Sequence, residues 1–281
     1  MTETSRTGAA GSPPGDGLPP GQARAAARAI EAALDRDGVA LLAPCDVHRA
    51  LAVVREAGLR PRCAMLDPWY NKGVGGVRDD YEEFLDALVE AAAGVADHVY
   101  LWGFPEIVAR RLDRLPAGLS LVAWLTWYYK NNPSVIRGWR SAQMTCLHLA
   151  RPGAPLHPEA FLTEAQAAKQ AQGKLRYMPG PPSVLEGQPD VIEEPLLVGF
   201  VGRREQTGHP SQKPRRVFET LLRMVLAEGE VVVDPLCGSG TTGAAARAVG
   251  GRAVLADHDP AWVAVSARRL GVTPLDLPSA P

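Results

Sequence analysis

Two short runs of this chain combine acidic, aromatic and glycine residues where a ligand could bind. The first is LDPWYN at residues 66–71, and the second is DPLCGSGTT at residues 234–242. Each follows a short apolar run that predicts a buried parallel strand. Ligands of open α/β sheets bind at the carboxyl ends of the strands. The sequence therefore predicts that an acidic–aromatic loop and a glycine loop lie where two ligands could meet.

The second run suits a cofactor that contains a nucleoside. Gly238 and Gly240 allow a ligand to approach the backbone closely, and Thr241 can serve the start of the following helix. Asp257 comes after the next predicted strand, where its carboxylate could bind ribose hydroxyls. Gly238, Gly240 and Gly243 also spell the GxGxxG pattern of dinucleotide-binding proteins. A nicotinamide-dependent oxidoreductase is therefore an alternative at this stage.

Together the two runs resemble the catalytic and S-adenosylmethionine-binding motifs of the DNA amino-methyltransferases, which methylate adenine N6 or cytosine N4. The catalytic run comes first and the cofactor run last, which is similar to the circularly permuted β class of that family. The resemblance implies an α/β, Rossmann-like fold with a mostly parallel sheet and helices on both faces. It also implies S-adenosylmethionine as cofactor, DNA as partner, and a site-specific bacterial or phage enzyme of the restriction–modification type.

The resemblance also assigns the cofactor residues. Residues 209–214, HPSQKP, match the family segment that precedes the glycine loop. There, Ser211 and Lys213 would seat the methionine carboxylate, which suits hydroxyl and ammonium donors. Asp46, which follows an apolar run, is a weaker match to the acid that reads the adenine amine. The expected cofactor set is Asp46, Ser211, Lys213, Asp234, Pro235, Gly238, Ser239, Gly240, Thr241 and Asp257.

The first run supplies the expected catalytic residues, which are Asp67, Pro68, Trp69 and Tyr70. An exocyclic amine is a poor nucleophile because its lone pair is delocalised into the ring. Asp67 and the carbonyl of Pro68 can accept hydrogen bonds from that amine and turn the lone pair toward the methyl donor. Tyr70 would stack on a base flipped out of the duplex. Trp69 stands where the family pattern has a second proline.

Contacts to DNA must come from local patches, because the net charge is only −1. Basic residues occur without acidic ones between Asp113 and Glu159, and they cluster again at residues 203–216. Such clusters neutralise phosphates when they share a face. Residues 127–132, WYYKNN, resemble the family segment that walls the flipped-base pocket. The expected DNA-binding residues are Lys130, Asn131, Arg137 and Arg140.

The composition and the alternation of predicted strands and helices divide the rest of the chain into segments. Residues 1–21 are rich in Gly, Pro, Ser and Thr, which predicts a disordered tail. Strands alternating with helices predict one methyltransferase domain with a catalytic half at 22–151 and a cofactor half at 196–271. Residues 152–195 have weak periodicity and predict a small target-recognition insert, and 272–281 form a second tail. Helices are expected at 23–34, 47–57, 81–93, 106–115, 215–227, 241–249 and 261–270.

The remaining features constrain the class of protein. The hydrophobic content of 46% is ordinary for a globular protein, and no apolar run approaches a membrane span. The four cysteines are far apart and show no metal-ligand spacing, which favours reduced thiols in a cytoplasmic protein and no metal. Whether the chain forms a homodimer stays open.

The resemblance thus implies methylation of a flipped DNA base, and it favours adenine N6 because adenine enzymes of the family more often begin the catalytic motif with Asp or Asn, as Asp67 does here. Cytosine N4 methylation is one alternative. A catalytically weak family member that binds DNA is another, since Trp69 departs from the pattern and the insert is short. The dinucleotide-dependent oxidoreductase is the third.

Overall fold

The computed structural model describes residues 19–71, 76–132, 135–136, 138–174 and 190–276. Within these residues, eight strands form one sheet in the order β1-β10-β9-β2-β3-β7-β4-β8. The strands of this sheet are β1 (Val39–Leu41), β2 (Cys63–Leu66), β3 (His98–Gly103), β4 (Ser120–Tyr128), β7 (Gln143–Ala150), β8 (Val191–Glu193), β9 (Val231–Asp234) and β10 (Arg252–Leu255). Neighbouring strands pair in parallel except β7, which is antiparallel to both β3 and β4.

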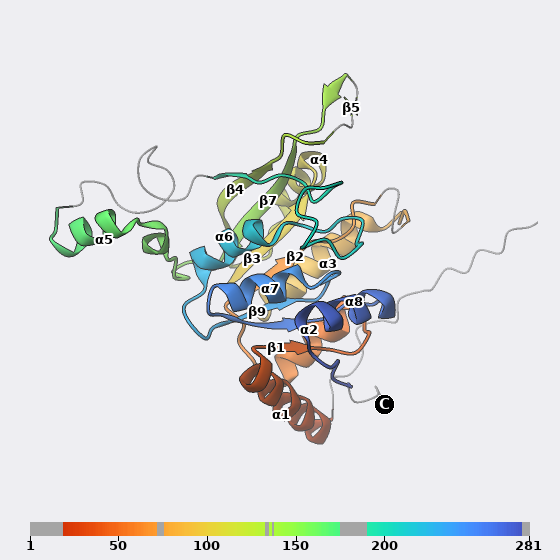
Figure 1. The fold of residues 1–281 in the computed structure, drawn as a ribbon. Helices are drawn as coiled ribbons and strands as arrows, with labels where there is room; N and C mark the ends of the chain where they lie inside the picture. The colour runs from red at the N-terminus through yellow and green to blue at the C-terminus, as the bar shows by residue number, and fades with distance from the viewer. Residues whose placement is uncertain (1–18, 72–75, 133–134, 137, 175–189, 277–281) are drawn as a thin grey trace, which may run out of the picture.

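Helices cover both faces of the sheet (Figure 1). One apolar cluster joins the sheet to the first three helices, and a second joins its other face to the last three. The helices are α1 (Pro20–Asp37), α2 (Val47–Glu56), α3 (Tyr81–Ala93), α4 (Pro105–Val108), α5 (Glu164–Ala171), α6 (Arg215–Val225), α7 (Thr241–Ala248) and α8 (Pro260–Leu270). This mostly parallel sheet with two helical layers confirms the predicted fold class.

The strands alternate their side chains between the two clusters, as a pleated strand requires. In β2, Ala64 and Leu66 belong to the cluster of α1–α3, whereas Cys63 and Met65 belong to the cluster of α6–α8. All four side chains are fully buried. Strands buried on both faces read as continuous apolar runs, which explains why short apolar segments predicted them correctly.

Three segments differ from the sequence-based expectations. The helix expected at 106–115 is one α-helical turn, α4, followed by a 3₁₀ helix at Ala109–Arg114. The insert expected at 152–195 includes β8, which pairs in parallel with β4 at the edge of the main sheet. The predicted tail at 272–281 begins beside the sheet, because Leu275 forms a bridge with Leu42. The tail expected at 1–21 lies outside the described residues except for its last three positions.

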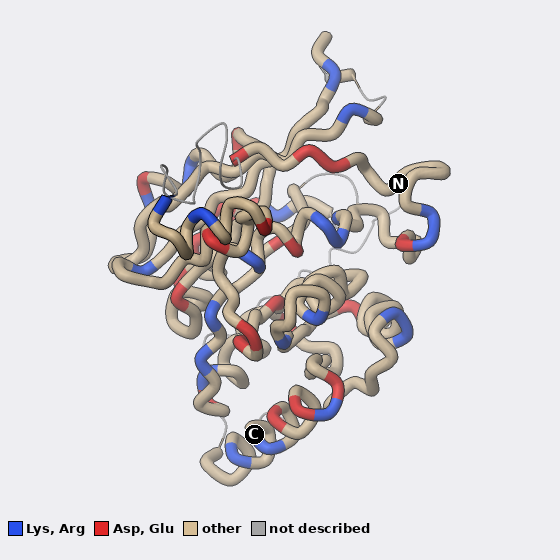
Figure 2. Tube along the Cα trace, turned by 60° about the vertical axis from the view of Figure 1, so that its left-hand side comes forward, with Lys and Arg blue, Asp and Glu red and all other residues tan. Residues whose placement is uncertain are grey.

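A two-stranded ribbon, β5 (Val135–Ile136) and β6 (Trp139–Arg140), continues the β4–β7 pair beyond the sheet. It projects away from the body of the molecule (Figure 1). Acidic and basic positions intermingle over the body, whereas the described part of the ribbon carries a basic position and no acidic one (Figure 2). Because β4 is parallel to β2, the ribbon leaves the sheet at the edge where the parallel strands end.

Across the part of the chain that the structure describes, no helix is long and apolar enough to cross a membrane. No cluster of three or more His, Cys, Asp or Glu side chains suited to a metal ion occurs in the same residues. The cysteines Cys45, Cys63, Cys146 and Cys237 are free thiols.

Candidate active site

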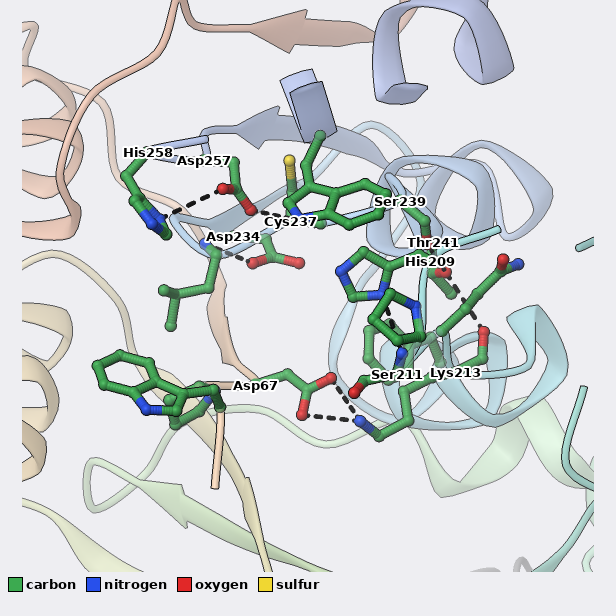
Figure 3. Close-up of a pocket in the computed structure, with 18 of the residues that line it drawn as sticks. Asp67, His209, Ser211, Lys213, Asp234, Cys237, Ser239, Thr241, Asp257 and His258 are labelled. Atoms are coloured by element: carbon green, nitrogen blue, oxygen red, sulfur yellow. Dashed lines mark hydrogen bonds and ion pairs between the residues drawn. The ribbon is translucent and has the colours of Figure 1, made fainter. Parts of the chain in front are cut away.

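The two loops meet because β2 and β9 are neighbours in the middle of the sheet, with Ala64 opposite Val233. Both strands end at the same edge, so the residues that follow them face one pocket (Figure 3). Residues 67–70 after β2, residues from the glycine loop after β9, and residues 209–213 line this pocket. Segments far apart in sequence therefore form one cavity at the carboxyl ends of the strands, where α/β proteins bind ligands.

The carboxylate of Asp67 is ion-paired within this pocket. Lys213 Nζ lies 2.8 and 2.6 Å from its two oxygens (Figure 3). The Tyr70 hydroxyl donates to Asp67 Oδ1 at 2.9 Å and accepts from Lys213 Nζ at 2.7 Å. The side chains of Lys213 and Asp67 are only 3% and 17% exposed. Removing one partner of such a desolvated pair costs about 3–5 kcal/mol.

The two aromatic residues of the catalytic loop differ in their surroundings. The Tyr70 ring packs against Phe104 with centroids 4.8 Å apart, and burial followed by the charge of Asp67 raises the pKa of its hydroxyl. Trp69 packs against Tyr81 and Phe84 of α3, and its carbonyl accepts a hydrogen bond from the Tyr81 hydroxyl. Trp69 thus holds the loop by packing at the position where the family pattern has a proline.

The glycine loop is held by hydrogen bonds within itself and by one to Asp257. Asp234, fully buried at the end of β9, accepts from the Leu236 amide at 3.0 Å and from the Thr242 hydroxyl. Burial raises the pKa of this carboxyl to about 7, and the nearby charges of Asp67 and Asp257 act in the same direction. Asp257 Oδ2 accepts from the Gly238 amide at 2.9 Å. The loop is therefore fixed before any ligand binds.

Gly238 has a positive φ of 48°, which disfavours side chains other than hydrogen. A Cβ atom at this position would lie 2.9 Å from Nε2 of His209. The His209 ring in turn packs against Trp262 of α8, with centroids 4.4 Å apart. Gly238 thus leaves room beside two pocket-lining rings that a larger residue would fill.

The charges of the pocket favour a cationic ligand. Of its lining residues, Asp67, Asp234 and Asp257 carry carboxyl groups, and Lys213 is the one lysine or arginine. Lys213 compensates the charge of Asp67, and burial raises the pKa of Asp234 to about 7. The remaining negative charge, chiefly that of Asp257, would attract a sulfonium or an ammonium group and repel a pyrophosphate. The loop geometry and the donor set therefore fit S-adenosylmethionine better than a dinucleotide, although both could use GxGxxG.

Most residues expected to hold the cofactor lie around this pocket, but three do not. Asp234, Gly238, Ser239, Thr241, Asp257, Ser211 and Lys213 are lining residues. Pro235 and Gly240 are not; Gly240 caps α7 with a positive φ. Asp46 is also outside, and its carboxylate caps α2 by accepting from the amides of His48 and Arg49.

Among the residues expected to bind DNA, Lys130 and Asn131 follow the end of β4 and Arg140 lies in β6, and their contacts differ. Lys130 pairs with Glu193 at 2.5 Å. Asn131 clamps the backbone of Leu196, donating to its carbonyl at 2.9 Å and accepting from its amide at 2.8 Å. Arg140 is exposed on β6 beside Trp139, which is 81% exposed. Arg137 lies outside the described residues.

Eight lining residues were missing from the sequence-based set, namely His209, Pro210, Gln212, Phe218, Leu236, Cys237, His258 and Trp262. His209 opens the HPSQKP run, so the motif itself could have found it. His258 directly follows Asp257, and Trp262 lies in the first turn of the next helix. Phe218 belongs to the apolar face of α6, and its sequence pattern predicts only a core position.

Comparisons with curated proteins agree with this geometry. A segment of 124 residues is 26% identical to the type II methyltransferase M.HpaI of Haemophilus parainfluenzae and covers 44% of this chain and 37% of that protein. A segment of 62 residues is 36% identical to the type II methyltransferase M2.DpnII of Streptococcus pneumoniae, covering 22% of this chain and 23% of that protein. The chain thus matches well under half the length of these relatives.

Solved structures share the fold. The S-adenosylmethionine complex of M1.HpyAVI superposes with a TM-score of 0.63 at 15% identity, covering 83% of this chain and all of that one. The cytosine-N4-specific PvuII DNA methyltransferase superposes with a TM-score of 0.58 at 14% identity, covering 87% of this chain and 98% of that one. At such identities the likeness concerns the fold alone.

A family model described as DNA methylase, for the N6 and N4 methyltransferases, matches residues 117–268. The match begins after the catalytic loop and includes Lys213, the glycine loop and Asp257. It spans more than half of the 281 residues. The chain therefore belongs to the N6/N4 DNA methylase family.

Proposed function

We propose that this protein transfers a methyl group from S-adenosylmethionine to an exocyclic amine of a DNA base extruded from the duplex. The observation that carries the proposal is the convergence of Asp67 with the glycine loop in one pocket that is rich in carboxyl groups. S-adenosylmethionine supplies an electrophilic methyl group on a positively charged sulfur. The acidic pocket favours that charge, and the space left by Gly238 admits the cofactor beside the backbone.

The residues of the catalytic loop orient the amine. Asp67 and the carbonyl of Pro68 accept hydrogen bonds from the two amine hydrogens, which directs the nitrogen lone pair toward the methyl group. A carboxylate offers about four acceptor sites. Asp67 can therefore bind the amine while it keeps Lys213, and the ammonium fixes the orientation of the carboxylate. Tyr70 closes this network with its hydroxyl on Asp67.

DNA reaches the pocket from the edge where β2, β4 and β9 end. The ribbon of β5 and β6 projects from this edge with exposed Trp139 and Arg140. Basic side chains there would contact phosphates and position the duplex over the pocket. The expected roles of Lys130 and Asn131 change accordingly: their bonds to Glu193 and Leu196 shape the edge, so we assign the direct phosphate contacts to the ribbon.

We further propose adenine N6 as the target in preference to cytosine N4. The support is Asp67 itself, because cytosine N4 enzymes of the family more often begin this loop with Ser, and adenine enzymes with Asp or Asn. Nucleoside mass spectrometry of DNA incubated with protein and labelled cofactor tests this choice. We expect label in N6-methyladenine. Label in N4-methylcytosine alone would overturn the base and leave the reaction class intact.

Transfer of a tritiated methyl group to DNA tests the reaction. Asp67→Ala removes the acceptor for the amine, so we expect turnover to fall on the order of 10³-fold while S-adenosylmethionine still binds. The variant also strands the buried ammonium of Lys213 and is expected to lose about 3–5 kcal/mol of stability.

The double variant Asp67→Ala/Lys213→Met separates folding from chemistry. It removes both charges, so its melting temperature should return toward that of the wild type while methyl transfer stays reduced on the order of 10³-fold. Turnover near the wild-type rate in either variant would refute the assigned role of Asp67. Methylation of RNA with none of DNA would refute DNA as the substrate.

A further inference from the structure

Phe200 is the most exposed large hydrophobic side chain in the described residues, at 89%. It lies in the turn formed by residues 196–206, between β8 and α6, which we call the Phe200 turn. Exposing a whole phenyl ring to water is unfavourable, and single apolar side chains on a surface can occur without function. The surroundings of Phe200 indicate that its exposed ring has a function.

The Phe200 turn is rigid, and its conformation presents the ring outward. The Gln206 side-chain amide donates to the carbonyls of Gly199 and Val201 at 3.2 and 2.7 Å, which fastens both sides of Phe200. Gly202 has a φ of 62°, and a Cβ atom there would clash with a methyl carbon of Leu197. The positive φ favours glycine at 202, so this turn, with Phe200 exposed in it, forms without backbone strain.

Both ends of the Phe200 turn are tied to the edge of the pocket. Its first residue, Leu196, is clamped by Asn131 from the end of β4. At its other end, the Gln212 amide donates to the carbonyl of Glu205 at 2.8 Å, and Gln212 lines the pocket. The turn, teal in Figure 1, lies on the side of the molecule from which β5 projects.

The charge of the Phe200 turn suits a polyanion. Arg203 and Arg204 are exposed, and neither lies within ion-pair distance of a carboxylate in the described parts of the chain. The neighbouring cations are satisfied, since Arg215 pairs with Glu219 at 2.7 Å and Arg269 with Glu205 at 3.2 Å. The turn thus displays one apolar ring and two available guanidinium groups beside the pocket.

We propose that the Phe200 turn inserts its ring into double-stranded DNA at the target site, with Arg203 and Arg204 on the flanking phosphates. The inference rests on the proposed function. Extruding a base leaves an unstacked gap, and an apolar wedge that enters the stack stabilises the distorted duplex. Phe200 is thereby a positioning residue that favours the extruded state and does not touch the reacting atoms.

The test compares one DNA preparation in its native and heat-denatured forms, using tritiated methyl transfer. Denatured strands need no wedge, because their bases are already unpaired. We expect Phe200→Ala to lower kcat/KM about 10-fold on native DNA and less than about 2-fold on denatured DNA. Phe200→Trp, which keeps an aromatic wedge, should stay within about 3-fold of the wild type on both. Leu156→Ala, an exposed apolar position on the opposite edge, is the matched control and should change neither.

Several outcomes would overturn the proposal. If Phe200→Ala lowers kcat/KM equally on both DNA forms, or does not lower it on native DNA, Phe200 does not act as a wedge. If Phe200→Ala converts a dimer to a monomer and lowers kcat/KM equally on both forms, the ring packs against a second copy of this chain. A wild type inactive on both DNA forms would instead contradict the proposed function, so the two failures are distinguishable.

The arginines have a separate readout in the salt dependence of DNA affinity. Arg203→Gln/Arg204→Gln should reduce the slope of log K against log salt by about 2, because two phosphates would no longer be neutralised. Arg24→Gln/Arg28→Gln removes the same charge at two exposed positions of α1, which does not line the pocket, and should leave the slope unchanged. Equal slopes for the two double variants would contradict the phosphate contacts.

Discussion

The glycine loop and the catalytic loop follow adjacent strands, yet they are fixed by different forces. The glycine loop is held by backbone geometry and buried hydrogen bonds, through Asp234 and through the Asp257–Gly238 contact. The catalytic loop is held by side chains, through the ion pair of Asp67 with Lys213 and the packing of Trp69. We infer that the cofactor side is preformed, whereas the amine side depends on a charge pair that the substrate joins.

The largest expected effect concerns the backbone of the glycine loop. Gly238→Ala places a Cβ atom 2.9 Å from His209 at a positive φ, so we expect S-adenosylmethionine affinity to fall ~100-fold or more. Gly229→Ala is the matched control, since Gly229 also has a positive φ of 77° but nothing lies within 4 Å of the place that an alanine methyl group would take. Both variants should lose about 1–2 kcal/mol of stability. If titration calorimetry shows that Gly238→Ala and Gly229→Ala bind S-adenosylmethionine equally well, Gly238 does not lie beside the bound cofactor.

The next effect distinguishes two roles for Lys213. The resemblance assigns its ammonium to the methionine carboxylate, and the structure pairs it with Asp67. If it mainly orients Asp67, Lys213→Met should lower kcat by about 10- to 100-fold and change S-adenosylmethionine affinity by less than about 3-fold. Arg36→Met, which breaks an exposed ion pair with Asp37 in α1, should change neither. A large loss of cofactor affinity with unchanged kcat would support the carboxylate role.

A smaller effect follows from the raised pKa of Asp234. Its folded-state pKa of about 7 lies above the ordinary value of 3.8 because the group is buried. The folded state therefore binds the proton more tightly than the unfolded state, and this contribution to stability is full below pH 3.8 and is lost as the pH rises through about 7. Asp234→Asn should flatten the fall in melting temperature over that range. Parallel pH profiles of the wild type and the variant would contradict the raised pKa.

The smallest effect concerns Trp69. Its indole N–H is buried and makes no hydrogen bond within the described structure, so Trp69→Phe removes an unsatisfied donor along with some packing. We expect the free energy of unfolding to change by less than about 1.5 kcal/mol. In Trp127→Phe, the indole that donates to the Glu194 carbonyl at 2.7 Å is lost. Trp127→Phe should be more destabilised than Trp69→Phe in urea titrations. The reverse order would contradict the claim that only the Trp127 indole contributes a stabilising hydrogen bond.

Local patterns predicted the secondary structure and the positions of the two loops, but not the contacts between the loops. The helix expected at 81–93 coincides with α3 because its apolar residues repeat with the helical period. The turn after β9 is encoded by contiguous residues, so its position follows from sequence. The pairing of Asp67 with Lys213 joins residues 146 positions apart, and it depends on which strands become neighbours. No local pattern carries that information.

Other differences have equally local causes. Asp46 precedes a helix, and its short acidic side chain satisfies two free amides of the first turn, which a sequence match to a cofactor acid does not reveal. β8 is three residues long and depends on β4 for its pairing. Its strand character therefore comes from the sheet edge beside it, and the surrounding composition predicts only an irregular insert.

Titration of ligands into the wild-type protein without DNA tests the central claim most directly, namely that the preformed glycine loop holds S-adenosylmethionine. Calorimetry should show one site per chain for S-adenosylmethionine and no binding of NAD, because the acidic pocket disfavours a pyrophosphate. Binding of NAD with no heat from S-adenosylmethionine would contradict the account and favour a dinucleotide enzyme.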